Sequence, residues 1–165
     1  MRTCVSVGTR VHTVTFVTQK IMYTLKEIVR LVGLDPTKLS REWAVIERGI
    51  STWLGSGHLK QVTLEIQTQD GTRLAGRWDL DIDYDLPGDG TMWADAQEVR
   101  YNILKAGDVP WTCEYSIWAS APGGPSVAGW GSGKMFSTSG FKRYSLGTTI
   151  DGNGIGVRAS YWRKS

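Results

Sequence analysis

Four aspartates form the arrangement in this chain that most resembles a catalytic site. Asp79, Asp81, Asp83 and Asp85 alternate with other residues, so a β-strand would project all four carboxylates from one face. Carboxylates gathered in this way can hold Mg²⁺, as in enzymes that transfer nucleotides. A strand with one solvated face produces the same spacing, and no phosphate-binding signature accompanies the aspartates. We therefore assign the row to solvent or to a partner and predict no metal site.

A cluster of glycines at residues 129–134 (GWGSGK) invites comparison with nucleotide-binding loops. A Walker A loop requires a glycine at the position of Ala128 and a serine or threonine at the position of Met135. An esterase elbow centred on Ser132 requires glycines two positions to either side, where tryptophan and lysine stand. Residues 152–156 begin like a dinucleotide fingerprint, but too little chain follows for a strand-helix-strand unit. These glycines are therefore predicted to form turns and bulges.

The histidines and cysteines form no recognisable metal-binding or nucleophilic set. His12 and His58 lack partners at helical spacing, and we expect His12 at the entrance to a helix and His58 in a loop. Cys4 and Cys113 are too few for a disulfide framework, and we interpret both as reduced thiols, with Cys113 buried in a strand. These residues therefore nominate no catalytic group and no cofactor site.

The composition is typical of one soluble globular domain. Of the 165 residues, 41% are hydrophobic and 21% are charged. The net charge of +3 is too small to indicate nucleic-acid binding by itself. No apolar stretch is long enough for a signal peptide or a membrane span, so we expect a cytoplasmic protein that does not bind membranes.

Residues 121–165 differ in composition from everything before them. They contain ten of the 20 glycines, six basic residues and one acidic residue. Aromatic and aliphatic side chains occur throughout, which distinguishes the segment from a disordered tail. Such a segment must pack in extended form and also bend sharply. Strands are expected in it near residues 135–138, 142–149 and 156–162.

Hydrophobic periodicity predicts two helices before this segment. One apolar stripe covers residues 14–32 and ends at Gly33. A second covers residues 39–54, after the start signal Asp35-Pro36. Because the turn between them is short, the two helices should lie antiparallel.

The periodicity then changes from that of a helix to that of a strand. Residues 62–66 and 74–84 alternate on either side of Asp70-Gly71, which predicts a β-hairpin. A third helix is expected between Thr91, as its cap, and Gly107. Its buried stripe is predicted to comprise Ala96, Val99, Ile103 and Leu104. A strand from about residue 111 to 119 should follow.

Six short segments carry a resemblance that extends over nearly the whole chain. They are residues 14–18 (VTFVT), 31–36 (LVGLDP), 52–55 (TWLG), 77–82 (RWDLDI), 146–149 (LGTT) and 161–163 (YWR). Together they resemble bacterial HORMA-domain proteins of cyclic-oligonucleotide-based antiviral signalling (CBASS) operons. The resemblance implies a single α+β domain whose helices pack on a mainly antiparallel sheet. It also implies a mobile N-terminal segment (1–12), a core (13–120) and a C-terminal safety belt (121–165).

The resemblance further implies a peptide-binding switch. In that family the safety belt wraps a short peptide, the closure motif, which joins the sheet as a strand; in the open state the belt takes the peptide's place. The implied partners are a cGAS/DncV-like nucleotidyltransferase, which the switch binds and helps to activate, and an AAA+ ATPase that engages residues 1–12 and reopens it. A second HORMA protein is left open, and nucleic acid is expected only through the enzyme complex.

On this resemblance we expect the peptide along one edge of the strand at residues 112–119. The residues predicted to line it are Thr112, Glu114, Ser116, Trp118, Trp130, Phe136 and Tyr144. The hinge of the belt is predicted at Pro122, Gly123, Gly124 and Pro125. Two other functions stay open at this stage: a small metal-dependent enzyme that uses the aspartate row, and a nucleic-acid-binding module that uses the basic, aromatic tail.

Overall fold

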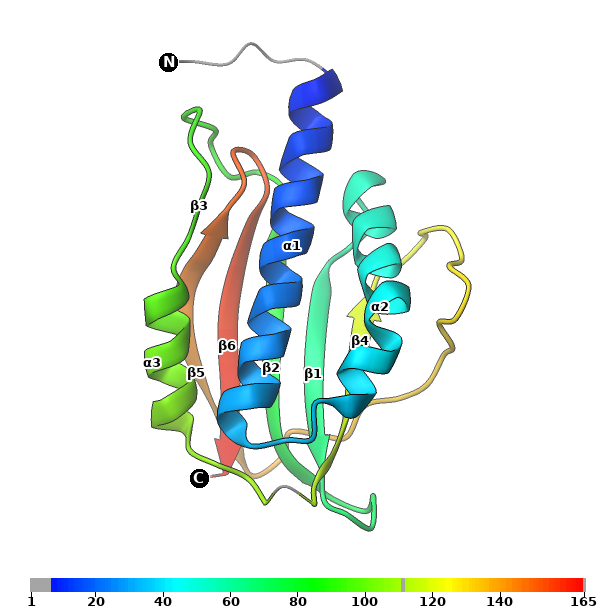
Figure 1. The fold of residues 1–165 in the computed structure, drawn as a ribbon, viewed down its shortest axis with the longest axis vertical. Helices are drawn as coiled ribbons and strands as arrows, with labels where there is room; N and C mark the ends of the chain where they lie inside the picture. The colour runs from blue at the N-terminus through cyan, green and yellow to red at the C-terminus, as the bar shows by residue number, and fades with distance from the viewer. Residues whose placement is uncertain (1–6, 111, 165) are drawn as a thin grey trace.

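Three helices lie on one face of a six-stranded antiparallel sheet (Figure 1). This computed structural model describes residues 7–110 and 112–164. The helices are α1 (Val7–Val32), α2 (Thr37–Gly55) and α3 (Ala96–Ala106). The strands are β1 (Gln61–Gln67), β2 (Leu74–Asp83), β3 (Trp93–Ala94), β4 (Glu114–Ser120), β5 (Phe141–Asp151) and β6 (Gly156–Lys164). Their order across the sheet is β3-β5-β6-β2-β1-β4.

The first two helices confirm the predicted stripes and lie antiparallel over the sheet (Figure 1). Each buries the apolar face that its periodicity indicated. Gly33 ends α1 with φ of 93°, a left-handed conformation that glycine adopts without steric cost. At the start of α2 the Asp35 carboxylate accepts from the Thr37 amide at 3.0 Å. Hydrogen bonding from Thr37 lowers the pKa of the Asp35 carboxyl.

The predicted hairpin is confirmed as β1 and β2. Val62, Leu64 and Leu80 are fully buried against the helices, as the alternation predicted. In the turn, the Asp70 carboxylate accepts from the Thr72 amide, and Gly71 has φ of 72°. The two strands form the centre of the sheet, onto which the later strands are added on both sides.

The third helix differs from its prediction at its start and in its stripe. Asp95, not Thr91, is the N-cap, and its carboxylate accepts from the Glu98 amide at 3.0 Å. Thr91 instead bonds Asp89 in the preceding loop. Val99 is buried, but Leu104 is 61% exposed, because a short helix at the edge of the layer buries only a narrow stripe.

The glycine-rich segment divides into two parts. Residues 121–140, which we call the connector, contain turns and no strand, so the strand predicted at 135–138 is wrong. Residues 141–164 form the β5–β6 hairpin, whose second strand pairs with β2. The strand predicted from residue 111 begins instead at Glu114, and Cys113 is buried just before it, where burial raises the pKa of its thiol.

The structure describes only the second half of the predicted N-terminal segment, residues 7–12. Residues 1–6, with Cys4, lie outside the described residues, whereas residues 7–12 already belong to α1, so His12 lies inside the helix and not at its entrance. His58 follows α2 in a loop, as predicted. No helix within the described part of the chain is both long and apolar enough to span a membrane.

Candidate functional site

The outer edge of β4 directs main-chain groups away from the sheet. β4 pairs with β1, and no other strand in residues 7–110 and 112–164 pairs with it. The amide of Ile82 donates to the carbonyl of Lys60 at 2.9 Å, so the even-numbered residues of β1 direct their main-chain groups toward β2. The odd-numbered residues of β1 therefore bond to the even-numbered residues of β4. Tyr115, Ile117 and Ala119 thus direct their N–H and C=O groups away from the sheet.

The connector passes around this edge, from the helix face of the sheet to the opposite face (Figure 1). On the helix face, Nε1 of Trp130 donates to the carbonyl of Val45 at 3.0 Å. The Trp130 ring meets that of Trp53 edge-on, with centroids 5.1 Å apart. On the opposite face, the amide of Phe136 donates to the carboxylate of Glu65 at 2.6 Å. The connector is therefore attached to the domain on both sides of β4.

A channel of about 500 Å³ lies between β4, α2 and the connector. Its lining residues are Lys38, Glu42, Val45 and Ile46 of α2, Ser116, Ile117, Trp118 and Ala119 of β4, and residues 129–133 of the connector. One wall is therefore the free edge of a strand. An extended peptide in this space could pair with that edge and would be enclosed by the connector.

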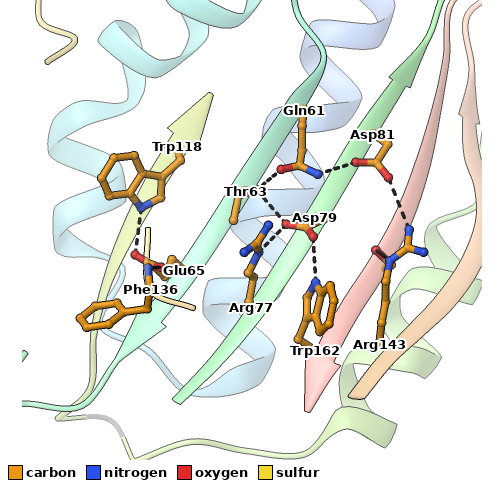
Figure 2. Close-up of polar contacts among 11 residues, drawn as sticks. Gln61, Thr63, Glu65, Arg77, Asp79, Asp81, Trp118, Phe136, Arg143 and Trp162 are labelled. Carbon is orange, nitrogen blue, oxygen red and sulfur yellow. Dashed lines mark hydrogen bonds and ion pairs between the residues drawn. The ribbon is translucent and has the colours of Figure 1, made fainter. Parts of the chain in front are cut away.

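Glu65 holds the connector on the face of the sheet that the helices do not cover. This glutamate is fully buried, and Figure 2 shows its carboxylate beside Trp118 and Phe136. It accepts from Nε1 of Trp118 at 3.0 Å as well as from the Phe136 amide. A buried carboxylate with two donors is stable only while both are in place, so the indole and the connector stabilise one another here.

Five of the seven residues predicted to line the peptide surround the free edge. Ser116 and Trp118 line the channel with Trp130, whereas Glu114 lies at the start of β4 and Phe136 on the face beyond its edge. Thr112 lies in the turn before β4. The alternation of β4 adds a detail that the sequence did not provide: the main-chain groups that reach the edge belong to the odd-numbered residues of the strand.

Tyr144 does not belong to this group. It lies in β5, which β6, β2 and β1 separate from β4. There its ring stacks on Tyr161, with centroids 5.1 Å apart. Strand alternation and aromatic composition could not place it, because only the sheet order shows on which side of β2 the hairpin lies.

The predicted hinge lies where β4 ends and the connector begins. Gly123 has φ of 76°, and the Gly124 amide bonds to the Ala121 carbonyl at 3.0 Å, which closes a turn. Nε1 of Trp53 donates to the carbonyl of Pro125 at 2.7 Å. Residues 122–125 therefore reverse the chain direction at a point that α2 fixes; movement at this turn stays a prediction.

One end of the aspartate row is buried, whereas Asp85 at the other end is exposed. Asp79 is only 3% exposed, and its carboxylate accepts from Thr63 at 2.7 Å, from Arg77 at 2.8 Å and from Trp162 at 2.8 Å (Figure 2). Asp81 accepts from Gln61 and lies 3.5 Å from Arg143. The sequence assigns the row to solvent or to a partner, and for Asp79 exposure to solvent is wrong: its carboxylate connects β6 of the β5–β6 hairpin to β1 and β2.

These contacts also bear on the metal alternative. Three donors already occupy the Asp79 carboxylate, which leaves little capacity for a cation. Among residues 7–110 and 112–164, no group of three or more His, Cys, Asp or Glu side chains is placed to hold a metal ion. The donor set at the aspartate row therefore favours a structural role.

Sequence reasoning missed three residues that shape the channel. Nζ of Lys38 donates to the outward carbonyl of Tyr115 at 2.7 Å. Glu65 holds the connector from the opposite face. Gly49, in the middle of α2, faces the Trp130 ring, and a Cβ at this position would overlap that ring. Only Gly49 left a signal in the sequence, since a glycine within a helix costs stability and calls for a packing reason.

Comparison with known proteins agrees with this geometry. The family model described as "Bacterial HORMA domain 2" matches residues 2–165. No curated protein matches the chain in sequence. A chain of the mitotic checkpoint complex shares the fold, with a TM-score of 0.74 at 10% identity over 92% of this chain and 98% of that one.

Two further structures that share the fold are complexes with a bound partner. C. elegans HTP-2 bound to the HIM-3 closure motif matches with a TM-score of 0.66 at 14% identity, over 92% of this chain and 90% of that chain. The complex of E. coli MS115-1 CdnC with HORMA-deltaN matches with a TM-score of 0.62 at 12% identity, over all of this chain and 93% of that chain. The fold is the α+β HORMA fold that the resemblance implied.

Proposed function

This chain belongs to the bacterial HORMA domain 2 family, and we propose that it is a switch that encloses a closure-motif peptide beside β4. The observation that carries the proposal is the path of the connector, which passes around an edge of β4 that no other described strand occupies. The β5–β6 hairpin pairs with β2, on the other side of the sheet. The resemblance describes an open and a closed state, and the absence of the hairpin from the described edge of β4 supports the closed one, in which the belt does not take the peptide's place.

The physical consequence of enclosure is slow release. A peptide that joins β4 gains main-chain hydrogen bonds, but it can leave only after the connector detaches from α2 or from Glu65. The dissociation rate is then set by the opening of the connector as well as by the peptide contacts. Such a site suits a signal that an external machine must terminate.

The proposal extends to partners. The complex of E. coli CdnC with a HORMA protein supports a nucleotidyltransferase of that kind as the protein that this switch binds and helps to activate in the cytoplasm. An AAA+ ATPase would reopen the domain by engaging the N-terminal segment at residues 1–12, of which residues 7–12 belong to α1. A second HORMA protein is a further candidate to carry the closure motif.

A display experiment tests peptide binding. We expect the immobilised full chain to select members of a phage-displayed library of random short peptides, and the selected peptides to dissociate slowly. The Trp130→Ala variant should release the same peptides at least about tenfold faster, because it removes one wall of the channel. Trp93→Ala is the matched control: this tryptophan is 42% exposed in β3, at the far edge of the sheet. Failure of the wild-type chain to select any peptide would contradict the proposal.

A second experiment tests the enzymatic partner. Co-expression with the nucleotidyltransferase of its own operon should yield a complex, and synthesis of cyclic oligonucleotides by that enzyme should depend on this chain. Trp130→Ala should reduce the stimulation more than Trp93→Ala does. Equal synthesis with and without the chain would show that peptide binding, if present, serves another partner.

A further inference from the structure

We propose that the channel selects peptides with apolar side chains at two positions separated by one residue, whose backbone passes close to Gly131. The inference rests on the proposed function and specifies the class of ligand. Three independent features of the channel support it: the length of the free edge, the nature of the wall formed by α2, and the positions of the connector glycines.

The free edge is short. Of the three residues that point outward, Tyr115 has its carbonyl occupied by Lys38 at 2.7 Å. Ile117 and Ala119 keep both of their outward groups. A peptide strand can therefore form a regular ladder with these two residues, and Lys38 marks its end beside Tyr115. Successive outward residues of β4 pair with every second residue of the peptide. The two paired residues, the one between them and one on either side make a ligand core of about five residues.

The wall on the helix face is apolar beside these two residues. Ile117 and Ala119 point their side chains toward α2, on the same face as Tyr115, whose hydroxyl bonds the Asp35 carbonyl. Neighbouring residues on adjacent strands project from the same face of a sheet. Peptide side chains beside Ile117 and Ala119 would thus meet Val45, Ile46 and Trp130. None of these three wall residues carries a charge, so apolar side chains fit both peptide positions.

Trp130 keeps this wall in place before a ligand arrives. Its indole is held by the Val45 carbonyl and by the Trp53 ring. The two charged residues of the channel, Lys38 and Glu42, precede Val45 on α2, and Lys38 bonds the carbonyl of Tyr115. The apolar preference is therefore confined to the Ala119 end, and polar peptide residues are expected at the Lys38 end.

The connector contributes three glycines to the channel, and the chain itself explains two of them. Gly129 has φ of 90°, and a Cβ there would approach Val45 within 2.7 Å. A Cβ at Gly133 would lie 2.8 Å from the Trp118 ring. Gly131 has no left-handed φ, and a Cβ there would meet no described atom within 4 Å. Since neither conformation nor packing requires glycine at 131, we assign it to close approach of the peptide backbone.

The experiment combines the display selection with Gly131→Val. The peptides that the wild-type chain selects should share two apolar residues separated by one, and fluorescence polarisation should show binding to Gly131→Val weakened about tenfold or more. The melting temperature should stay at the wild-type value. Gly55→Val is the matched control, because Gly55 also has no left-handed φ and no atom within 4 Å of an added Cβ, but it lies at the end of α2, outside the channel.

The outcomes separate the inference from the proposed function. Selection of no peptide would overturn peptide binding itself. Selected peptides that lack the apolar spacing, or that bind Gly131→Val as tightly as wild type, would overturn only the assignment of ligand class. Weakened binding by Gly131→Val but not by Gly55→Val, at unchanged melting temperature, would support the inference.

Discussion

The connector and the β5–β6 hairpin are consecutive parts of one glycine-rich segment, yet they are held in different ways. The connector is attached at isolated points: Pro125 to Trp53, Trp130 to Val45, and Phe136 to Glu65. The hairpin shares a continuous ladder with β2 and buries Ile150, Ile155, Val157, Ala159 and Tyr161. Isolated contacts open locally at low cost, whereas a ladder with a buried face opens only with the domain. The connector can therefore release a ligand while the hairpin stays in the sheet.

The largest effect should follow from weakening the hairpin. Tyr161 is 2% exposed and lies between Trp78 and Tyr144, at centroid distances of 5.0 and 5.1 Å. Tyr161→Ala should lower the free energy of unfolding in urea by about 3–5 kcal/mol, as for other large buried aromatic residues. Tyr144→Ala is the control, and it should cost much less because Tyr144 is 36% exposed. A small, equal loss in both variants would show that the hairpin is not part of the cooperative fold.

A somewhat smaller effect should come from the polar connection between the hairpin and the core. Asp79→Ala leaves the donors of Thr63, Arg77 and Trp162 without their acceptor in a buried place. We expect a loss of about 3 kcal/mol in the free energy of unfolding. Asp83→Ala should change it by less than about 1 kcal/mol, since that carboxylate is partly exposed and accepts from the nearby Asp85 amide. Equal losses would return Asp79 to the solvated role that its spacing suggested.

The contrast between the two aspartates shows which features were predictable from sequence. The helices and the β1–β2 hairpin follow from periodicity and local turn chemistry, and the structure confirms them. Asp79 and Asp83 have the same local pattern, but Asp79 receives a hydrogen bond from Trp162, 83 residues away. Likewise, Phe136 reaches Glu65 over 71 residues. Such contacts depend on the order of strands in the sheet, which no local pattern encodes, so the path of the connector and the position of Tyr144 could not be derived.

A third prediction addresses the connector alone. Gly49→Ala should favour the helical state of α2 by about 1 kcal/mol through propensity, but the added Cβ overlaps the ring of Trp130. We expect the two effects to offset each other roughly in the free energy of unfolding, while Trp130 leaves its place. Hydrogen exchange should then accelerate at residues 126–137 and stay unchanged in β5 and β6. Equal acceleration in the hairpin would contradict the independence of the two parts.

The smallest predicted effect is the change in stability at low pH that follows from protonation of Glu27. α3 packs beside β5, and Arg100 on α3 lies 3.1 Å from Glu27 on α1. Hydrogen bonds from Arg30, and then from Arg100, hold the pKa of Glu27 at about 2, against an ordinary 4.5. A carboxyl whose pKa is lower in the folded than in the unfolded chain stabilises the fold while ionised, so this contribution is present above pH 4.5 and is lost as the pH falls to about 2.

Glu27→Gln isolates that contribution. The variant should be less stable than wild type by about 1 kcal/mol at neutral pH, because the two arginines are half exposed to water and screening weakens the pairs. The difference between the two proteins, measured by urea unfolding at a series of pH values, should shrink between pH 4.5 and 2. A difference that stays constant over this window would mean that the ionised form of Glu27 does not stabilise the fold. Because none of the three connector contacts involves Glu27, peptide dissociation should be equally fast in both proteins.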